Sequence, residues 1–234
     1  MTPDEIGRKL AQAAQRALPE GGDGDRAAAR AEAAILKDLR PVTPLAPSWL
    51  YILILLLLFA AAAVDSASVL GMAGLRALSP PQRALIFAAL FGAASLAAVA
   101  CSRQMRPASG RNLAPLAWIL APSLLAPVFA LLLSGYELLH FVHEGIPCLV
   151  AGLSVAIPTG LAISLLLRRG FVLDWSAAGL AAGVLGGLAG VAMLEMHCPN
   201  LKAIHVIVWH MAVVMVSGAL GVLVGRFSRS ARFL

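Results

Sequence analysis

Charged side chains are scarce in this sequence. Asp, Glu, Lys and Arg make up 13% of its 234 residues, whereas a soluble protein usually carries about 25%. The apolar share is 60%, above the ~45–50% of soluble domains. The charges are also uneven, because 14 of the 30 lie in residues 1–47. This distribution excludes an ordinary soluble globular domain and predicts membrane spans joined by short loops.

Motifs of common catalytic sites are missing as well. The sequence has no phosphate-binding P-loop, no zincin helix and no nucleophile elbow, so we do not expect an enzyme. Three cysteines are too few for a disulfide scaffold. The net charge of +6 comes from basic residues at the ends of apolar stretches, and not from a continuous patch. Direct binding of nucleic acid is therefore not expected, and the lipid bilayer is the expected environment.

Six long apolar stretches are present instead, each about as long as a helix that crosses ~30 Å of hydrocarbon. None of them contains Asp, Glu, Lys or Arg. They lie at residues 48–64, 84–101, 114–135, 149–167, 175–194 and 205–225. The predicted fold is all-α, a polytopic membrane protein with a six-helix bundle over residues 48–234. Ion-coupled transporters usually carry charged groups in mid-membrane, so their absence argues against that class.

The distribution of Lys and Arg predicts the orientation. With the N-terminus inside, the inner segments hold 15 of these residues and the outer segments hold three, which are Arg76, Arg83 and Lys202. Positive charge favours the cytoplasmic side of a membrane. We therefore expect a multi-pass protein of the bacterial inner membrane with both termini in the cytoplasm.

Glycines recur at four-residue spacing in the fifth stretch, at Gly179, Gly183 and Gly187, and again in the sixth, at Gly221 and Gly225. Such small-xxx-small ridges let helices approach closely. Packing within one bundle is the favoured interpretation, and dimerisation through the same ridge is the alternative.

Residues 1–47 form a separate cytoplasmic segment in this interpretation. The spacing of its apolar residues predicts two short helices, separated by a glycine-rich break near residues 21–24 and ended by Pro41. Neither helix carries enough large apolar side chains for a core of its own, so the segment is expected to lie on the membrane surface or to dock on a partner protein, and docking is favoured. The candidate partner-binding residues are Ile6, Leu10, Leu36, Asp38, Leu39, Arg40 and Pro41.

The chemistry-bearing residues gather at the opposite, outer side. Cys148 opens the fourth stretch, and His197 and Cys198 occupy the outer loop after the fifth. Cys and His are the usual ligands of zinc and similar transition metals. The candidate metal ligands are His140, His143, Cys148, His197, Cys198 and His205. His205 and His210 are five residues apart, a spacing that matches a single helix face less well.

A second chemistry is open to the same thiols. Cys148 and Cys198 both lie near outer helix ends, so a disulfide or redox pair is a rival to metal binding. We therefore treat them as candidate signal-sensing thiols, with metal and oxidant both open. Cys101 lies at the inner end of the second stretch and is expected to be inert packing.

Several strings resemble one family in their order and spacing. They are Asp38-Leu39-Arg40-Pro41-Val42 before the first stretch, Leu78-Ser79-Pro80-Pro81-Gln82-Arg83 before the second, Pro147-Cys148-Leu149 opening the fourth, Leu167-Arg168-Arg169-Gly170 closing it, and His197-Cys198-Pro199 followed by Trp209. Together they resemble the NrsF family of bacterial membrane anti-sigma factors, from about residue 36 to 230. Two positions depart from the family pattern. Asn200 stands where an acidic residue is common, and His210 stands where a Tyr or similar residue often follows the Trp.

The resemblance implies a negative regulator of transcription in a stress response. The N-terminal segment would hold an extracytoplasmic-function sigma factor at the membrane, and a metal or oxidant acting at Cys148 and Cys198 would release it. The alternatives are a small metal or solute transporter, a metal-binding membrane protein, and a membrane enzyme or electron carrier that uses the outer histidines. No cofactor is certain from the sequence, and a transition-metal ion such as zinc is the candidate.

Overall fold

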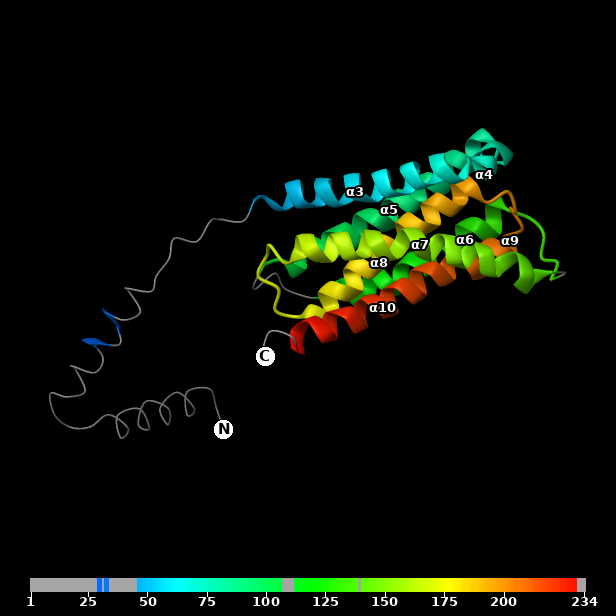
Figure 1. The fold of residues 1–234 in the computed structure, drawn as a ribbon. Helices are drawn as coiled ribbons and strands as arrows, with labels where there is room; N and C mark the ends of the chain where they lie inside the picture. Colours follow the sequence, from blue (N-terminus) through cyan, green and yellow to red (C-terminus); the bar gives the residue numbers. More distant parts are fainter. Residues whose placement is uncertain (1–28, 31, 34–45, 107–111, 139, 231–234) are drawn as a thin grey trace, which may run out of the picture. The chain divides into compact units, whose positions relative to one another are not determined.

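The computed structural model describes residues 29–30, 32–33, 46–106, 112–138 and 140–230. The regular elements of the membrane unit are all helical in these residues (Figure 1). They are α3 (Ser48–Leu70), α4 (Ala73–Ala77), α5 (Pro80–Gln104), α6 (Ala114–Leu132), α7 (Phe141–Leu167), α8 (Trp175–His197), α9 (Ala203–His205), the π-helical turn η1 (Val206–His210) and α10 (Met211–Ser230). The predicted all-α fold is confirmed.

Among the described residues, six helices are long and apolar enough to cross a membrane, which agrees with the predicted spans in number and order. Several boundaries differ from those of the apolar stretches, including those of α5 and α6. Helix α3 continues to Leu70, α7 begins at Phe141, and α8 continues to His197. Hydropathy marks only the part of a helix that suits hydrocarbon, whereas the backbone hydrogen bonds continue through polar residues such as Asp65, Glu144 and Glu195.

Helix α8 is the central helix of the bundle. Every residue from 177 to 196 is buried, and the helix packs against α3, α5, α6, α7 and α10 (Figure 1). Its sequence is dominated by Ala, Gly and Leu. Small side chains leave room for five neighbours around one axis, because backbones can then approach closely.

The glycine ridges lie inside the bundle, as the favoured interpretation predicted. A Cβ atom added at Gly179 would meet the carbonyl oxygen of Gly221 on α10, and one added at Gly221 would meet that of Gly179. On another face of α8, a Cβ at Gly186 would meet the carbonyl oxygen of Ala156 on α7. The glycines of α8 therefore let the backbones of α10 and α7 pack directly against its own backbone on two faces.

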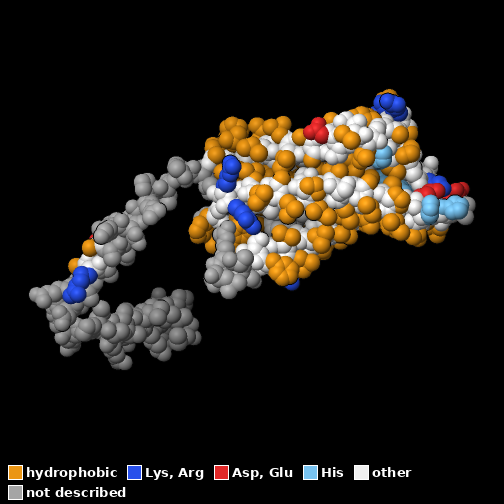
Figure 2. Space-filling model, in the orientation of Figure 1, with side chains coloured by type: hydrophobic (Ala, Val, Ile, Leu, Met, Phe, Trp, Pro, Cys, Tyr) orange, Lys and Arg blue, Asp and Glu red, His pale blue; other side chains and the backbone are white. Residues whose placement is uncertain are grey.

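The bundle has two chemically different ends. The thiol end, as we call it, comprises the start of α7, the end of α8, α9 and η1. The arginine end carries Arg103, Arg106, Arg168, Arg169 and Arg226. Histidine side chains gather at one end of the space-filling view together with acidic ones, and a further acidic patch lies along the side; Lys and Arg lie at both ends, with a mostly apolar belt between them (Figure 2).

Candidate functional site

The thiol end brings together four side chains from four chain segments. Cys148 lies in the second turn of α7, Cys198 caps the C-terminus of α8, His205 ends α9, and His210 ends η1. Their candidate ligand atoms all lie within 4.8 Å of one another. These residues are up to 62 positions apart in the sequence, and the packing of α7, α8 and α10 brings them together.

The two thiols are the nearest pair. The Sγ atoms of Cys148 and Cys198 are 3.4 Å apart, and both cysteines are free. Cys198 Sγ also lies 3.7 Å from Nε2 of His205. Cys198 is 4% exposed and His205 2% exposed, while Cys148 is half-buried. One thiol therefore faces the surface, and the other lies behind it among the histidines.

A buried carboxylate stands behind this group. Oε1 of Glu195, on the last turns of α8, lies 2.7 Å from Nδ1 of His210. Glu195 is fully buried and His210 is 1% exposed. Oε2 of Glu195, Nε2 of His210 and Nδ1 of His205 are buried without a hydrogen-bond partner among the described residues. Such groups are uncommon in native proteins and call for a ligand or a further partner.

The π-helical turn explains how His205 and His210 come to face each other. In an α-helix with 3.6 residues per turn, residues five apart point about 140° away from one another. In η1 the hydrogen bonds run from i to i+5, which places the fifth residue nearly above the first. The two rings are 5.4 Å apart and perpendicular. The expectation that their spacing is poorly matched was wrong, because it assumed an unbroken α-helix.

Local contacts hold the loop that carries Cys198. Asn200 donates a hydrogen bond to Oε2 of Glu144 at 2.8 Å, and its own Oδ1 accepts one from the backbone of Lys202 at 3.2 Å. The Lys202 ammonium lies 3.5 Å from Glu137. On the other side, a Cβ at Gly74 of α4 would meet the carbonyl oxygen of Cys198. The loop therefore contacts α4 on one side, and the first turn of α7 and the segment before it on the other.

The environment of Cys198 favours its protonated form. A hydrogen bond with Cys148 and burial both raise the pKa of the Cys198 thiol, and the nearby His205 and His210 lower it in part. A thiol whose pKa is raised is a weak nucleophile at neutral pH, because the thiolate is the reactive species. A divalent cation would reverse this balance by stabilising the thiolate.

An open depression of about 600 Å³ leads from the surface to these groups. Cys148, Cys198 and His205 lie at its base, while His143 and Glu144 lie on its wall. A small ion or oxidant can therefore reach the thiols from the thiol end without entering the apolar bundle.

The predicted site residues separate into two groups. Cys148, Cys198 and His205 converge, and His143 lines the depression. His140 is exposed at the N-terminus of α7, in a left-handed conformation with φ of 58°. His197 is turned away, with Nδ1 3.0 Å from the carbonyl oxygen of Gly71.

His210 and Glu195 are not among the site residues predicted from the sequence. The spacing of His205 and His210 gives no sign of the π-helical turn, and Glu195 lies one residue beyond the apolar stretch that ends at residue 194. A usable signal was present: Glu195 precedes Cys198 by three residues, so both lie on one side of the last turn of a helix.

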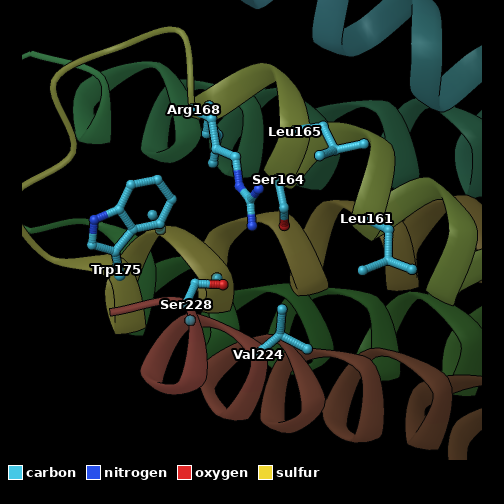
Figure 3. Close-up of a pocket in the computed structure, with 11 residues that line it drawn as sticks. Leu161, Ser164, Leu165, Arg168, Trp175, Val224 and Ser228 are labelled. Carbon is cyan, nitrogen blue, oxygen red and sulfur yellow. The ribbon is translucent and has the colours of Figure 1, made fainter. Parts of the chain in front are cut away.

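A second concave surface lies near the arginine end, between α7, α8 and α10. This groove holds about 200 Å³ and is lined mainly by apolar side chains such as Leu161 and Val224. Arg168 reaches into it beside Ser164, with Ser228 on the opposite wall (Figure 3). The lining offers neither a thiol, an imidazole nor a carboxylate, so its chemistry suits a lipid chain and not a metal or an oxidant.

Cys101 is fully buried in α5. It lies toward the arginine end of that helix and does not belong to the thiol group, as expected for a packing residue. The partner-binding candidates from Ile6 to Pro41 lie outside the described residues.

The bundle and its thiol end define a multi-pass membrane protein with a Cys/His site at one end. The model of the NrsF family, described as negative regulator of sigma F, matches residues 36–229. The chain therefore belongs to the NrsF family of negative regulators of sigma F. No curated protein and no solved structure matched the chain in the corresponding comparisons.

Proposed function

We propose that this protein is a membrane-bound anti-sigma factor of the bacterial inner membrane that holds an extracytoplasmic-function sigma factor through residues 1–47. A signal at the thiol end, either a metal ion or an oxidant, then releases the sigma factor. The family match supports the regulatory role. The observation that carries the sensing role is the 3.4 Å approach of Cys148 Sγ to Cys198 Sγ from two different helices.

The orientation in this proposal puts the thiol end outside and both termini in the cytoplasm. The excess of Lys and Arg on the inner segments supports it. The signal and the sigma factor would then act on opposite sides of the membrane, and the helices between them would carry the response as a shift between two conformations of the bundle.

The first test is co-purification from the native membrane. The tagged full-length chain should retain a sigma factor, and a chain without residues 1–41 should not. A variant with Leu36→Ser and Leu39→Ser should lose the partner, while the matched variant Ala27→Ser and Ala28→Ser should keep it. If the full-length chain carries no sigma factor, the proposal is wrong.

The second test concerns the signal. Cys148→Ser and Cys198→Ser should each change sigma-dependent transcription under metal or oxidant stress, whereas Cys101→Ser should not, because Cys101 is buried away from the thiol pair. Wild-type responses in both thiol variants would remove the sensing role and leave the anti-sigma role standing.

A further inference from the structure

We infer that Cys148, Cys198, His205 and His210 form a four-ligand Cys2His2 site for a divalent metal ion of the zinc type, with Glu195 as the carboxylate that orients His210. The inference decides between the metal and the oxidant left open above. The inference rests on the proposed function only in treating the metal ion as the sensed signal. Binding of the ion itself depends on this bundle alone.

The distances match the size of such a site. Zn–S bonds of ~2.3 Å and Zn–N bonds of ~2.0–2.1 Å at tetrahedral angles place ligand atoms roughly 3.4–3.8 Å apart. The Cys148–Cys198 distance is 3.4 Å and the distance from Cys198 Sγ to His205 Nε2 is 3.7 Å. The full set lies within 4.8 Å, so the widest pair needs to close by about 1 Å to meet the bond lengths of a tetrahedral ion.

The second argument is the orientation of His210. Its Nδ1 faces Glu195 at 2.7 Å, which leaves Nε2 buried and without a hydrogen-bond partner in the described chain. A metal-bound histidine usually donates its other ring N–H to a carboxylate or carbonyl, and this fixes the tautomer that presents the ligand nitrogen. Glu195 and His210 have this arrangement.

Charge balance supports a divalent ion at this depth. Binding converts the Cys148 and Cys198 thiols into thiolates and releases their protons, and each imidazole must offer an unprotonated nitrogen to the ion. Two thiolates neutralise a divalent cation, so the filled site carries no excess charge apart from Glu195. Burial of an unbalanced ion would be costly. Because the ligands are soft sulfur and imidazole nitrogen, Zn²⁺ and similar ions are favoured over Mg²⁺ or Ca²⁺.

Access is provided by the depression at the thiol end. The ion would meet Cys148 first, because this thiol is half-buried, and would then reach Cys198 and the histidines behind it. Closing four ligands on one ion would tie α7, the end of α8, α9 and η1 together. The site therefore connects α7, α8 and the segment that leads into α10, whose relative positions a signal would need to change.

The test uses the purified full-length protein in detergent, reduced and stripped of metal, with no sigma factor present. Co²⁺ should bind at one ion per chain and give the intense visible absorption of tetrahedral thiolate coordination, and Zn²⁺ should displace it. His205→Ala and His210→Ala should each weaken binding at least tenfold. Glu195→Gln should weaken it about 10–100-fold, the usual effect of losing such a carboxylate.

Two matched variants control for the loss of a histidine as such. His143 lines the same depression but is not one of the four ligands, and His197→Ala loses only the contact with Gly71. Both variants should bind Co²⁺ as the wild type does. Cross-linking of Cys148 to Cys198 by a thiol oxidant should survive in His205→Ala and His210→Ala, which shows that the bundle is folded. If these variants do not fold, X-ray absorption at the zinc edge of the wild type decides instead, and two sulfur and two nitrogen ligands are expected.

Wild-type affinity in both histidine variants, or a zinc shell without two sulfur and two nitrogen atoms, would overturn the inference. Neither result would touch the anti-sigma role, because no sigma factor is present in the measurement. Conversely, failure of the co-purification test would leave the metal result intact.

Discussion

Cys198 lies in surroundings unlike those of a free, solvent-exposed thiol. It touches Cys148 and His205, lies close to His210, and is almost fully buried. Its hydrogen bond with Cys148 and its burial raise its pKa. The thiol is therefore held protonated in the reduced protein, and it becomes a strong nucleophile or ligand only when something displaces its proton.

This property predicts a pH profile for alkylation of the reduced, metal-free protein. The rate at Cys198 should rise with a midpoint above the ordinary thiol value of ~8.5, because only the thiolate reacts. In Cys148→Ala the hydrogen bond that raises the pKa is lost, so the midpoint should move to lower pH. Mass spectrometry of the peptide that contains Cys198 gives the rates.

The midpoint, and not the absolute rate, is compared, since the substitution also opens the site. His143→Ala should leave the profile unchanged, and equal midpoints in wild type and Cys148→Ala would contradict the prediction.

Three members of the thiol group were predictable from the residue types alone. Cys148, Cys198 and His205 lie near helix ends on the same predicted side of the membrane, and the fold brings them together. His140 and His197 satisfied the same rule, but His140 precedes α7 in a left-handed conformation, and His197, the last residue of α8, faces the carbonyl oxygen of Gly71. His210 required the π-helical turn, which forms where α9 continues into α10 and which period-based reasoning does not anticipate.

At the scale of helices, the number and order of the spans followed from hydropathy, because each apolar stretch must cover the hydrocarbon thickness. Where the helices end did not follow, since Glu144 and Glu195 interrupt the apolar runs and not the backbone hydrogen bonds. The glycines of α8 predicted close helix packing. Which glycine faces α10 and which faces α7 is known only from the structure.

The close contact of α8 with α10 predicts a large effect of one methyl group. Gly179→Ala should destabilise the bundle by about 1–3 kcal/mol, the usual cost of overpacking, because the new Cβ meets the backbone carbonyl of Gly221 and cannot rotate away. Unfolding of the detergent-solubilised protein measures the change in free energy.

Gly92 on α5 offers a matched control. A Cβ at this glycine meets nothing within 4 Å, so Gly92→Ala should leave the bundle as stable as the wild type or raise its stability slightly, by roughly 0.5–1 kcal/mol, because alanine favours the helix. If both substitutions have the same effect, the glycines of α8 serve flexibility or another contact and not the packing described above.

At the scale of the whole molecule, the two ends of the bundle must face opposite sides of the membrane. Phe171 lies between α7 and α8 beside the arginine end, and Tyr136 lies between α6 and α7 at the thiol end; they are 62% and 59% exposed. In a chain with all three cysteines changed to Ser, Tyr136→Cys should react with a membrane-impermeant maleimide on spheroplasts, and Phe171→Cys should react only after permeabilisation. The reverse pattern would place the thiol end in the cytoplasm and overturn the proposed route of the signal.

Thermodynamic coupling relates metal binding at the thiol end to sigma-factor binding at residues 1–47. If a metal ion at the thiol end weakens sigma-factor binding to residues 1–47, the bound sigma factor must weaken metal binding by the same factor, because coupling between two sites is reciprocal. A coupling of ~1–3 kcal/mol corresponds to roughly 5–150-fold in affinity. We therefore expect Zn²⁺ to bind the sigma-bound protein more weakly than the free protein, as measured by competition with a chelator at fixed pH, and we expect added Zn²⁺ to lower sigma-factor affinity by a matching factor. His210→Ala should remove both effects while sigma-factor binding persists. Equal zinc affinities with and without the sigma factor would mean that the bundle binds two ligands without coupling them, and that another group carries the signal.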